Sequence, residues 1–304
     1  MAAQSAATSC LAYCLTLNKN MRQHQRSLKQ IGFFLLYTFS ITWLSWLIII
    51  IGNKYFNCLL YGEPLFWIPY LIGGLAPAIS SYIIYRQFNE DFIPESFFKY
   101  VFGRKIDRNA WLIFGLFTIW RLLMIWIAFG INRPISILSI IINLPLLILL
   151  GGLEELGWRG ILQPQLEKTI NYLPSILVVG TIWSIWHLPL WFIKGTVQSS
   201  FPFGLYLFSG IILTASFTTL YKYTNNLFLC VLSHAWFNGC IGLALYVGNN
   251  GTLQLDLNWK VIVAFSLELI VSICLGIAYS RKNPLMLNNH FKPRKRTSLT
   301  NNHE

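Results

Sequence analysis

The sequence predicts an all-α protein, a polytopic membrane helix bundle with about eight transmembrane helices. Hydrophobic residues make up 55% of the chain and charged residues only 11%, which is far from the composition of a soluble domain. Eight apolar stretches have about the 20 residues that a helix needs to cross the hydrocarbon core of a bilayer. Most of the 23 Lys and Arg residues lie between or beyond these stretches, as in a membrane protein.

The eight stretches follow one another at short intervals. The fourth is longer than a span requires, so we expect it to tilt or to continue past the membrane surface. Prolines that fall inside stretches are expected to kink them, because proline removes a backbone donor; these are Pro69, Pro77, Pro145 and Pro189. The predicted spans are 31–51, 65–85, 110–131, 134–166, 174–193, 202–221, 226–247 and 259–279.

The spans form one predicted intramembrane domain, residues 31–280, between two basic cytoplasmic extensions. Residues 1–30 are expected to be disordered, and residues 281–304 form a basic tail. The net charge of +12 lies in loops and tails beside apolar spans, so it predicts no nucleic-acid partner. The six cysteines are scattered without paired CxxC units, which predicts neither a disulfide framework nor a thiolate metal site.

The basic residues also predict the orientation. With an even number of spans, 18 of the 23 Lys and Arg residues fall on the side of the termini, and four fall on the other side. The positive-inside rule therefore predicts that both termini are cytoplasmic. The protein is expected to be an integral, multi-pass membrane protein, in the plasma membrane if its host is bacterial.

Three ionisable residues interrupt the fourth stretch. An ionisable group at the centre of a bilayer costs roughly 2.5 to 3.5 kcal/mol, so Glu154, Glu155 and Arg159 require a compensating role. In a helix, Glu155 lies above Arg159, which predicts an ion pair that leaves Glu154 without a charged partner. Glycines at 151, 152, 157 and 160 would let other helices or a peptide approach closely.

Two later stretches carry further polar groups. His187 follows Trp183 by four residues in the fifth stretch, and Asn238 follows His234 by four in the seventh. Glu154, His187 and His234 each lie about 9 to 13 residues from the cytoplasmic end of their spans, hence roughly 13 to 20 Å deep. The groups are therefore predicted to meet in one layer, where they could activate water and stabilise an oxyanion.

This order of motifs, Glu-Glu-x-x-x-Arg, aromatic-x-x-x-His and His-x-x-x-Asn on successive helices, resembles the intramembrane CAAX-protease and bacteriocin-processing enzymes. That family is also called the Abi or type II CAAX endopeptidase family. The resemblance covers about residues 142–245. Trp183 stands where the family more often has Phe, so we expect the aromatic packing to be kept and the pocket to be reshaped.

The resemblance implies an endopeptidase that acts on a peptide or lipidated-protein substrate among membrane lipids. It implies that Glu154 and His187 activate a water, that His234 and Asn238 hold the carbonyl oxygen, and that Glu155 and Arg159 support the site or orient the substrate. A metalloprotease would use Glu154, His187 and His234 as ligands of one zinc ion. A glutamate mechanism without metal uses the same residues, and the sequence leaves both open.

Two lone charges remain, Arg121 in the third stretch and Glu268 in the eighth. They are expected to pair with each other; the alternative is that Arg121 contacts a substrate carboxylate. Two other functions also stay open: a non-catalytic membrane protein of bacteriocin self-immunity or envelope resistance, and a proton-coupled transporter. The complete motif set argues against the first, and its clustering on three late helices argues against the second.

Overall fold

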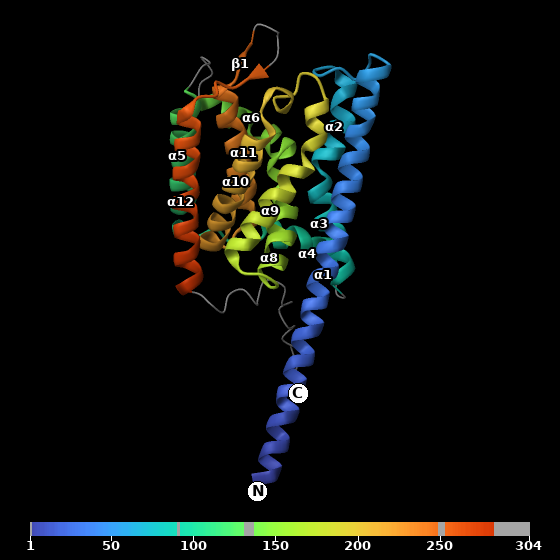
Figure 1. Ribbon diagram of the computed structural model, residues 1–304, viewed down its shortest axis with the longest axis vertical. Coiled ribbons are helices and arrows are strands. Elements are labelled where there is room, and N and C mark those ends of the chain that lie inside the picture. The colour runs from blue at the N-terminus through green and yellow to red at the C-terminus, as the bar shows by residue number, and fades with distance from the viewer. Residues whose placement is uncertain (1, 90–91, 131–136, 249–252, 283–304) are drawn as a thin grey trace, which may run out of the picture.

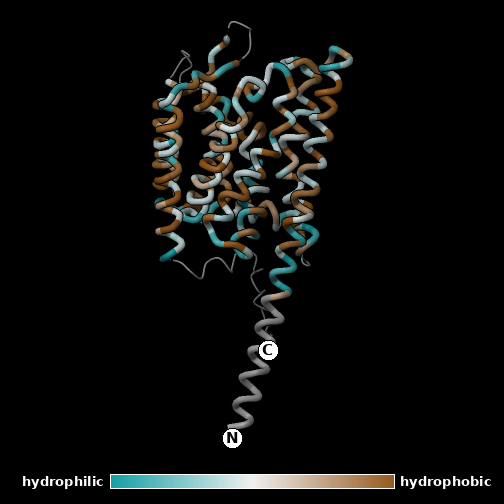
Figure 2. Tube along the Cα trace, viewed as in Figure 1, coloured by the Kyte–Doolittle hydropathy of each residue, from teal (hydrophilic) through white to brown (hydrophobic). Residues whose placement is uncertain are grey.

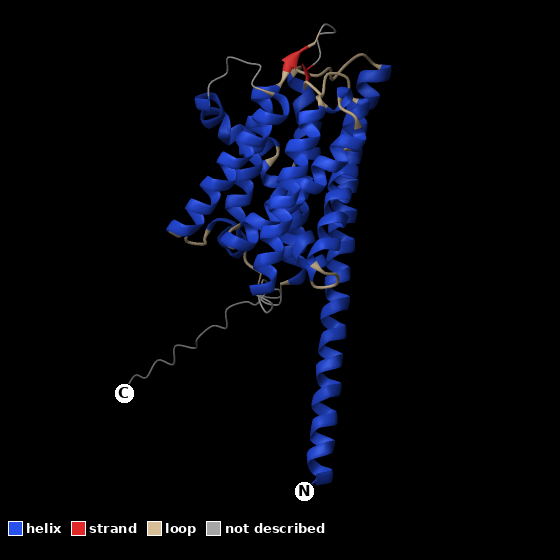
Figure 3. Cartoon of the chain, turned by 60° about the vertical axis from the view of Figure 1, so that its left-hand side comes forward, coloured by secondary structure: helices blue, strands red, loops and turns tan. Residues whose placement is uncertain are grey.

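The protein is a bundle of long, roughly parallel and antiparallel helices (Figures 1 and 3). A computed structural model describes residues 2–89, 92–130, 137–248 and 253–282, with the backbone alone for residues 2–20. Within these ranges, seven helices are long and apolar enough to cross a membrane, and the number is eight if one bent pair counts as a single span. The predicted all-α membrane bundle is thus confirmed.

The spans occur in the predicted order, and several consist of more than one helical segment. A short helix, α4, joins the second and third spans. The elements are α1 (Ala2–Tyr55), η1 (Pro64–Phe66), α2 (Trp67–Gly74), α3 (Ala76–Phe88), α4 (Pro94–Phe102), α5 (Arg108–Phe129), α6 (Ile137–Leu150), η2 (Gly152–Glu154), α7 (Glu155–Gly157), η3 (Trp158–Leu162), α8 (Gln163–Glu167), α9 (Tyr172–Trp186), η4 (Leu188–Phe192), η5 (Gln198–Ser200), α10 (Phe203–Thr224), α11 (Leu227–Ala244), β1 (Tyr246–Val247), β2 (Leu253–Gln254) and α12 (Trp259–Lys282).

The bundle has two ends, which we name by the elements they carry. The N-terminal face carries α4, α8 and the last turn of α12, and α1 enters the bundle there (Figure 1). The hairpin face carries the antiparallel pair β1–β2 and the loops 56–63 and 193–202. The N-terminal extension was expected to be disordered, but the backbone of residues 2–30 is part of helix α1. The sequence before Gly32 contains no glycine or proline that would end this helix. The tail lies outside the described residues from position 283 onward.

The fourth span is broken rather than simply tilted or extended. Its two parts, α6 and the run Gly152–Glu167, meet at an angle of 43°. The break falls at Gly151, which has φ −171° and ψ −40°, outside the helical region. Below the break the backbone passes through a 3₁₀ turn, one α-turn and the π-helical turn η3 before α8. Such π-turns occur mostly as single turns and often at functional sites.

The prolines act differently at different positions. Pro145 remains inside α6, whereas α9 ends at Trp186 and continues as the 3₁₀ segment η4, which contains Pro189. The second span is interrupted at Leu75, just before Pro77 in α3. A proline lacks the N–H that would continue a helix, so it favours these ends.

Hydrophobic residues occur along all the spans (Figure 2), and their side chains are found both on the outside of the bundle and in its interior. Lipid tails are as apolar as the core, so close helix packing has to come from shape and polar contacts. Gly180 of α9 provides one such contact: a Cβ at this position would lie 2.6 Å from the Cα of Ile211 in α10. The two helices that carry or border the site therefore approach backbone to backbone.

The predicted pair of lone charges is confirmed. Arg121 Nη1 of α5 lies 2.7 Å from Glu268 Oε1 of α12, with both side chains almost fully buried. Arg121 Nη2 also donates to the Ser216 hydroxyl of α10 at 2.7 Å. These contacts join three helices in the membrane interior, and they give the guanidinium of Arg121 a structural role.

Candidate active site

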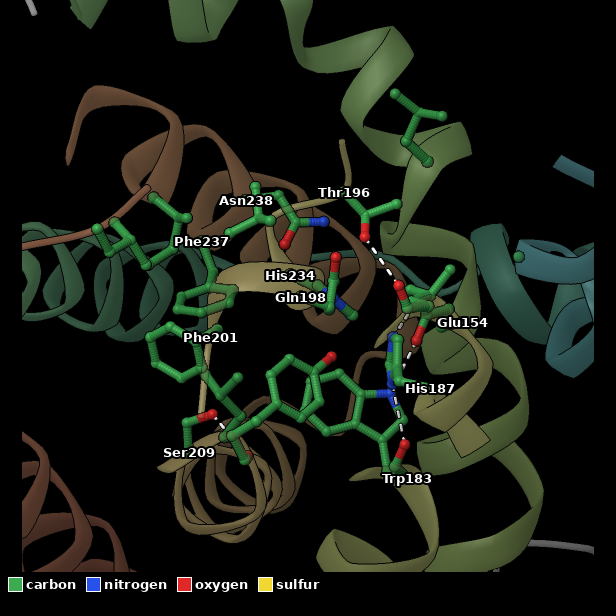
Figure 4. Close-up of a pocket in the computed structure, with 18 of the residues that line it drawn as sticks. Glu154, Trp183, His187, Thr196, Gln198, Phe201, Ser209, His234, Phe237 and Asn238 are labelled. Atoms are coloured by element: carbon green, nitrogen blue, oxygen red, sulfur yellow. Dashed lines mark hydrogen bonds and ion pairs between the residues drawn. The ribbon is translucent and has the colours of Figure 1, made fainter. Parts of the chain in front are cut away.

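The predicted polar residues come together at the broken span (Figure 4). Glu154 ends η2 directly after the break, His187 caps α9, and His234 and Asn238 lie one turn apart on α11. The break itself allows the close approach: a Cβ on Gly151 would lie 2.2 Å from Asn238 Nδ2 and 3.4 Å from His234 Nε2. A side chain at 151 would displace these groups, so the site needs glycine there.

Glu154 is buried and receives two indole N–H groups. Its Oε2 accepts from Trp183 Nε1 at 2.8 Å and from Trp158 Nε1 at 3.3 Å. Its Oε1 lies 4.0 Å from His187 Nε2. Among the described residues Glu154 has no Arg or Lys partner, as predicted, but the two indoles hold its carboxylate in one orientation and leave Oε1 toward His187.

His187 presents its second ring nitrogen to Glu154. Its Nδ1 lies 2.9 Å from the carbonyl oxygen of Trp183, which can only accept, so Nδ1 carries the proton. In the neutral ring Nε2 then holds the lone pair. The rings of Trp186 and Trp183 pack edge-on against the imidazole, at 4.4 and 5.0 Å between centroids, and fix its plane.

His234 is held by the ion pair that the sequence predicted. Arg159 Nη1 lies 3.1 Å from Glu155 Oε2, which confirms the i, i+4 pair, and Glu155 Oε1 lies 2.8 Å from His234 Nδ1. Arg159 Nη2 also donates to the Leu213 carbonyl oxygen at 3.4 Å. Glu155 accepts a hydrogen bond from Nδ1 of His234, so the proton of the neutral ring is on Nδ1. Nε2 can therefore donate only when the ring carries a second proton. The carboxylate of Glu155 would balance the positive charge of that protonated ring.

Phe217 of α10 connects the site to the structural charge pair. Its ring stacks on His234, with centroids 5.3 Å apart and planes 25° apart. The guanidinium carbons of Arg159 and Arg121 lie 5.1 and 5.3 Å from the same ring centroid. Cation–π contacts of this kind stabilise a desolvated guanidinium, so Phe217 helps to accommodate both buried arginines.

The site faces a cavity of about 290 Å³. Glu154, His187, His234 and Asn238 all line it, and Figure 4 shows them around one space with Gln198 and Phe201 from the loop before α10. Large aromatic side chains make up much of the wall; these include Trp46, Tyr70, Trp183, Trp186, Tyr206 and Phe237. A cavity of about 290 Å³ with such walls has room for a bulky apolar side chain.

The predicted zinc ligands do not form a metal site in this arrangement. Among the described residues, no group of three His, Cys, Asp or Glu side chains is placed to hold a metal ion. Glu154 Oε1 and His187 Nε2 are 4.0 Å apart, and Oε2 of Glu154 is already bonded to two indoles. Ligands of one tetrahedral zinc ion at about 2.0 to 2.2 Å would have to lie closer together.

Sequence reasoning missed the parts played by Trp158, Phe217 and the indole N–H of Trp183. Trp183 was expected only to keep the aromatic packing and Trp158 was given no role, although an indole N–H buried beside a carboxylate is a signal for a hydrogen bond. Phe217 lies in an apolar run of α10 with no local pattern that marks it. The contact of Trp183 with Glu154 requires an N–H, which the more usual Phe at this position of the motif cannot supply.

Replacing Trp183 by Phe tests this contact. We expect the cleavage rate to fall about tenfold with little change in KM, because a hydrogen bond to a charged group contributes about 1.5 kcal/mol or more. The measurement is the initial rate of peptide cleavage, compared with the rate of Trp236→Phe. Trp236 also donates its indole N–H, to the Thr118 carbonyl oxygen, but away from Glu154. Equal rates for the two variants would remove Trp183 from the site.

Comparison with known proteins agrees with this geometry. The family model "Type II CAAX prenyl endopeptidase Rce1-like" matches residues 136–240, which include Glu154, His187, His234 and Asn238. The chain is also 25% identical over 196 residues to "CAAX prenyl protease 2" of Methanococcus maripaludis, an alignment that covers 59% of this chain and 71% of that protein. The matched region carries the broken span, α9 and most of α11, the elements that build the site. The predicted resemblance to the CAAX-protease family is thus confirmed over the part of the chain that builds the site.

Proposed function

We propose that this protein hydrolyses a peptide bond in or beside the membrane by means of a water held between Glu154 and His187. The distance of 4.0 Å between Glu154 Oε1 and His187 Nε2 carries the proposal. It is too long for a direct hydrogen bond, yet one water can bond to both atoms at ordinary distances of about 2.8 Å. The water would lie on the cavity side, where a peptide carbonyl can approach.

In this proposal, the water oxygen attacks the carbonyl carbon of the scissile peptide bond while its proton passes to Glu154 or His187. The carbonyl oxygen becomes an oxyanion and accepts from Asn238 Nδ2 and from Nε2 of protonated His234. When the tetrahedral intermediate collapses, the C–N bond breaks and the stored proton moves to the leaving nitrogen. The products are a carboxylate and an amine.

Glu155 and Arg159 serve this mechanism as positioning residues. Glu155 holds His234 through Nδ1, so that Nε2 is directed to the cavity. Arg159 neutralises Glu155 and, through the Leu213 carbonyl oxygen, joins it to α10. An oxyanion donor contributes to catalysis only when it is held at the correct place before the reaction, which is the role assigned to this chain of contacts.

The substrate class follows from the membrane setting and the relatives. A peptide, or a lipidated protein as the name of the archaeal relative indicates, would reach the cavity among membrane lipids. The distribution of Lys and Arg over the loops supports a cytoplasmic location for both termini, and in a bacterial host the membrane would be the plasma membrane.

A comparison of membrane peptides tests the function and finds substrates at the same time. Mass spectrometry is applied to membranes of cells that carry either the wild type or Glu154→Gln. We expect fragments that depend on Glu154, with their precursors accumulating in the variant. Identical peptide patterns would contradict hydrolysis and leave a non-catalytic binding function.

Metal removal tests the remaining alternative of a zinc enzyme. Since the proposed mechanism has no step through a metal, protein purified and dialysed against a chelator is expected to retain its cleavage rate within about twofold, a change of roughly 0.4 kcal/mol. Metal content and rate are measured on the same preparation. If the chelator abolishes activity and added zinc restores it, Glu154, His187 and His234 would be zinc ligands that move closer together when the ion binds.

A further inference from the structure

One face of α1 is buried against the helices that carry or support the site. Every fourth residue from position 34 to position 46 has at most 2% of its surface exposed; these residues are Phe34, Thr38, Thr42 and Trp46. Residues four apart share a face of a helix, so the four side chains form one line along α1. We name this line the α1 stripe. Two of its members are polar, which a face turned toward lipid or an apolar core would not need.

Thr42 connects the stripe to α9 and α2. The indole Nε1 of Trp186 donates to the Thr42 hydroxyl at 2.7 Å, and the hydroxyl donates to the Gly73 carbonyl oxygen at 2.8 Å. The direction is fixed at both ends, because an indole N–H can only donate and a carbonyl oxygen can only accept. Pro77 has no N–H for the carbonyl of Gly73, four residues earlier, so Thr42 supplies the donor that the helix lacks.

A second contact from α1 reaches the same turn of α9. Trp43 Nε1 donates to the carbonyl oxygen of Trp186 at 3.1 Å. In the 3₁₀ segment that follows, position 189 is a proline without an N–H, and the N–H of Leu190 donates to the carbonyl oxygen of His187. Trp43 therefore provides the donor for the Trp186 carbonyl. The residue directly before His187 is held by α1 through both its side chain and its backbone.

The Trp186 ring lies against both halves of the site. Its centroid is 4.4 Å from that of the His187 imidazole and 5.6 Å from that of Trp158, whose indole donates to Glu154. A shift of the Trp186 ring would therefore move His187 directly and Glu154 through Trp158. The distance of 4.0 Å between Glu154 Oε1 and His187 Nε2 thus depends on where Trp186 is held.

Two aromatic residues of the α1 stripe support the same arrangement. The Trp46 ring lies 5.3 Å from Trp186 and 6.3 Å from His187 between centroids. Phe34 packs edge-on against Trp158 at 5.5 Å. Packed interiors have few gaps in which a ring can move, so a change on α1 is transmitted to the site rather than absorbed.

We propose, on the basis of the proposed function, that Thr42 of α1 is a positioning residue for hydrolysis. Its hydroxyl fixes the Trp186 ring, and that ring sets the separation of Glu154 and His187 at which one water can bond to both. A misplacement of about 1 Å at a reacting centre can lower a rate about a hundredfold. The first span is thus part of the machinery of the site, although Thr42 acts only through Trp186.

Thr42→Val tests the contact, because valine has nearly the shape of threonine and lacks the hydroxyl. The variant leaves the buried indole N–H of Trp186 without its acceptor, and we expect kcat to fall about tenfold or more while KM changes less than about twofold. Thr42→Ser keeps the hydroxyl and is expected to restore kcat to within about threefold of the wild type. Initial rates per amount of folded protein are measured over a range of concentrations of a peptide found in the membrane-peptide comparison.

Thr38→Val is the matched control, since it is the same change one turn earlier in the α1 stripe. The Thr38 hydroxyl is equally buried and has no hydrogen-bond partner among the described residues. Its removal breaks no such bond, so kcat is expected to change less than about twofold. Equal kcat values for Thr38→Val and Thr42→Val would overturn the proposal.

The ring signals of His187 report its position without catalysis. The chain has five histidines, so NMR of protein labelled in histidine gives few signals, and the signal that His187→Gln removes belongs to His187. We expect Thr42→Val to shift this signal and Thr38→Val to leave it in place. An unshifted His187 signal in Thr42→Val would overturn the proposal whether or not the protein hydrolyses peptides.

The proposed function and this inference can fail separately. If the peptide pattern does not depend on Glu154 while Thr42→Val shifts the His187 signal, hydrolysis is wrong and the positioning of His187 by Thr42 stands. If cleavage depends on Glu154 while Thr42→Val cleaves as fast as Thr38→Val, hydrolysis stands and the positioning role is wrong.

Discussion

Glu154→Gln is expected to lower the cleavage rate at least about a thousandfold while the protein still inserts and folds. The amide oxygen of Gln can accept from the indoles of Trp183 and Trp158 as the carboxylate does. What the variant loses is the ability to take a proton from water, and a general base contributes about 10² to 10⁴ to the rate. The side chain also becomes neutral, which removes a buried charge. The measurement is the initial rate on purified protein, together with the yield of folded protein in detergent.

The matched control is Glu95→Gln, the same chemical change in the exposed first turn of α4. Its rate is expected to equal that of the wild type within about twofold, because an exposed charge at a helix end contributes at most about 1 kcal/mol to stability and is remote from the cavity. A rate for Glu154→Gln within tenfold of the wild type would show that Glu154 is not the base. Poor folding of Glu154→Gln would be detected in the same preparation.

The spans and the layer of the site were predictable because their signals are local. Hydropathy predicted the positions of the spans. The four-residue spacings predicted the ion pair of Glu155 with Arg159 and placed His234 and Asn238 on the same face of their helix. The Arg121–Glu268 pair followed from the cost of leaving either charge alone in the membrane. In each case one physical requirement, burial or pairing, allowed few arrangements.

The rest depends on tertiary placement that no local pattern contains. The glycines at 151 and 152 predicted close approach, but the 43° break and the π-turn depend on how the lower half packs against α1 and α9. The role of Trp183 was missed because an aromatic residue at this position satisfies packing with or without its N–H. Which side chains line the cavity could not be predicted either, since depth along a span gives the level of a residue and not the direction it faces.

Breaking the pair behind His234 should affect folding and catalysis in separable ways. Arg159→Met leaves the Glu155 carboxylate, which has no exposed surface, without its cation. Removing one partner of a buried pair costs about 3 to 5 kcal/mol, so we expect a large loss of folded protein and a lower Tm in detergent. Adding Glu155→Gln removes the stranded charge and should restore most of the stability. Catalysis should stay low in the double variant, because Gln cannot balance the charge of a protonated His234.

The equivalent pair away from the site gives the control. Arg121→Met strands Glu268, which is also buried, and should destabilise the protein by a similar amount. Here Arg121→Met with Glu268→Gln should restore both folding and the cleavage rate, since neither residue lines the cavity or contacts His234. Recovery of catalysis by the Glu155–Arg159 double variant as well would mean that this pair has only a structural role. Failure of the Arg121–Glu268 double variant to recover activity would mean that coupling through Phe217 reaches the site, because that ring lies against both guanidinium groups and His234.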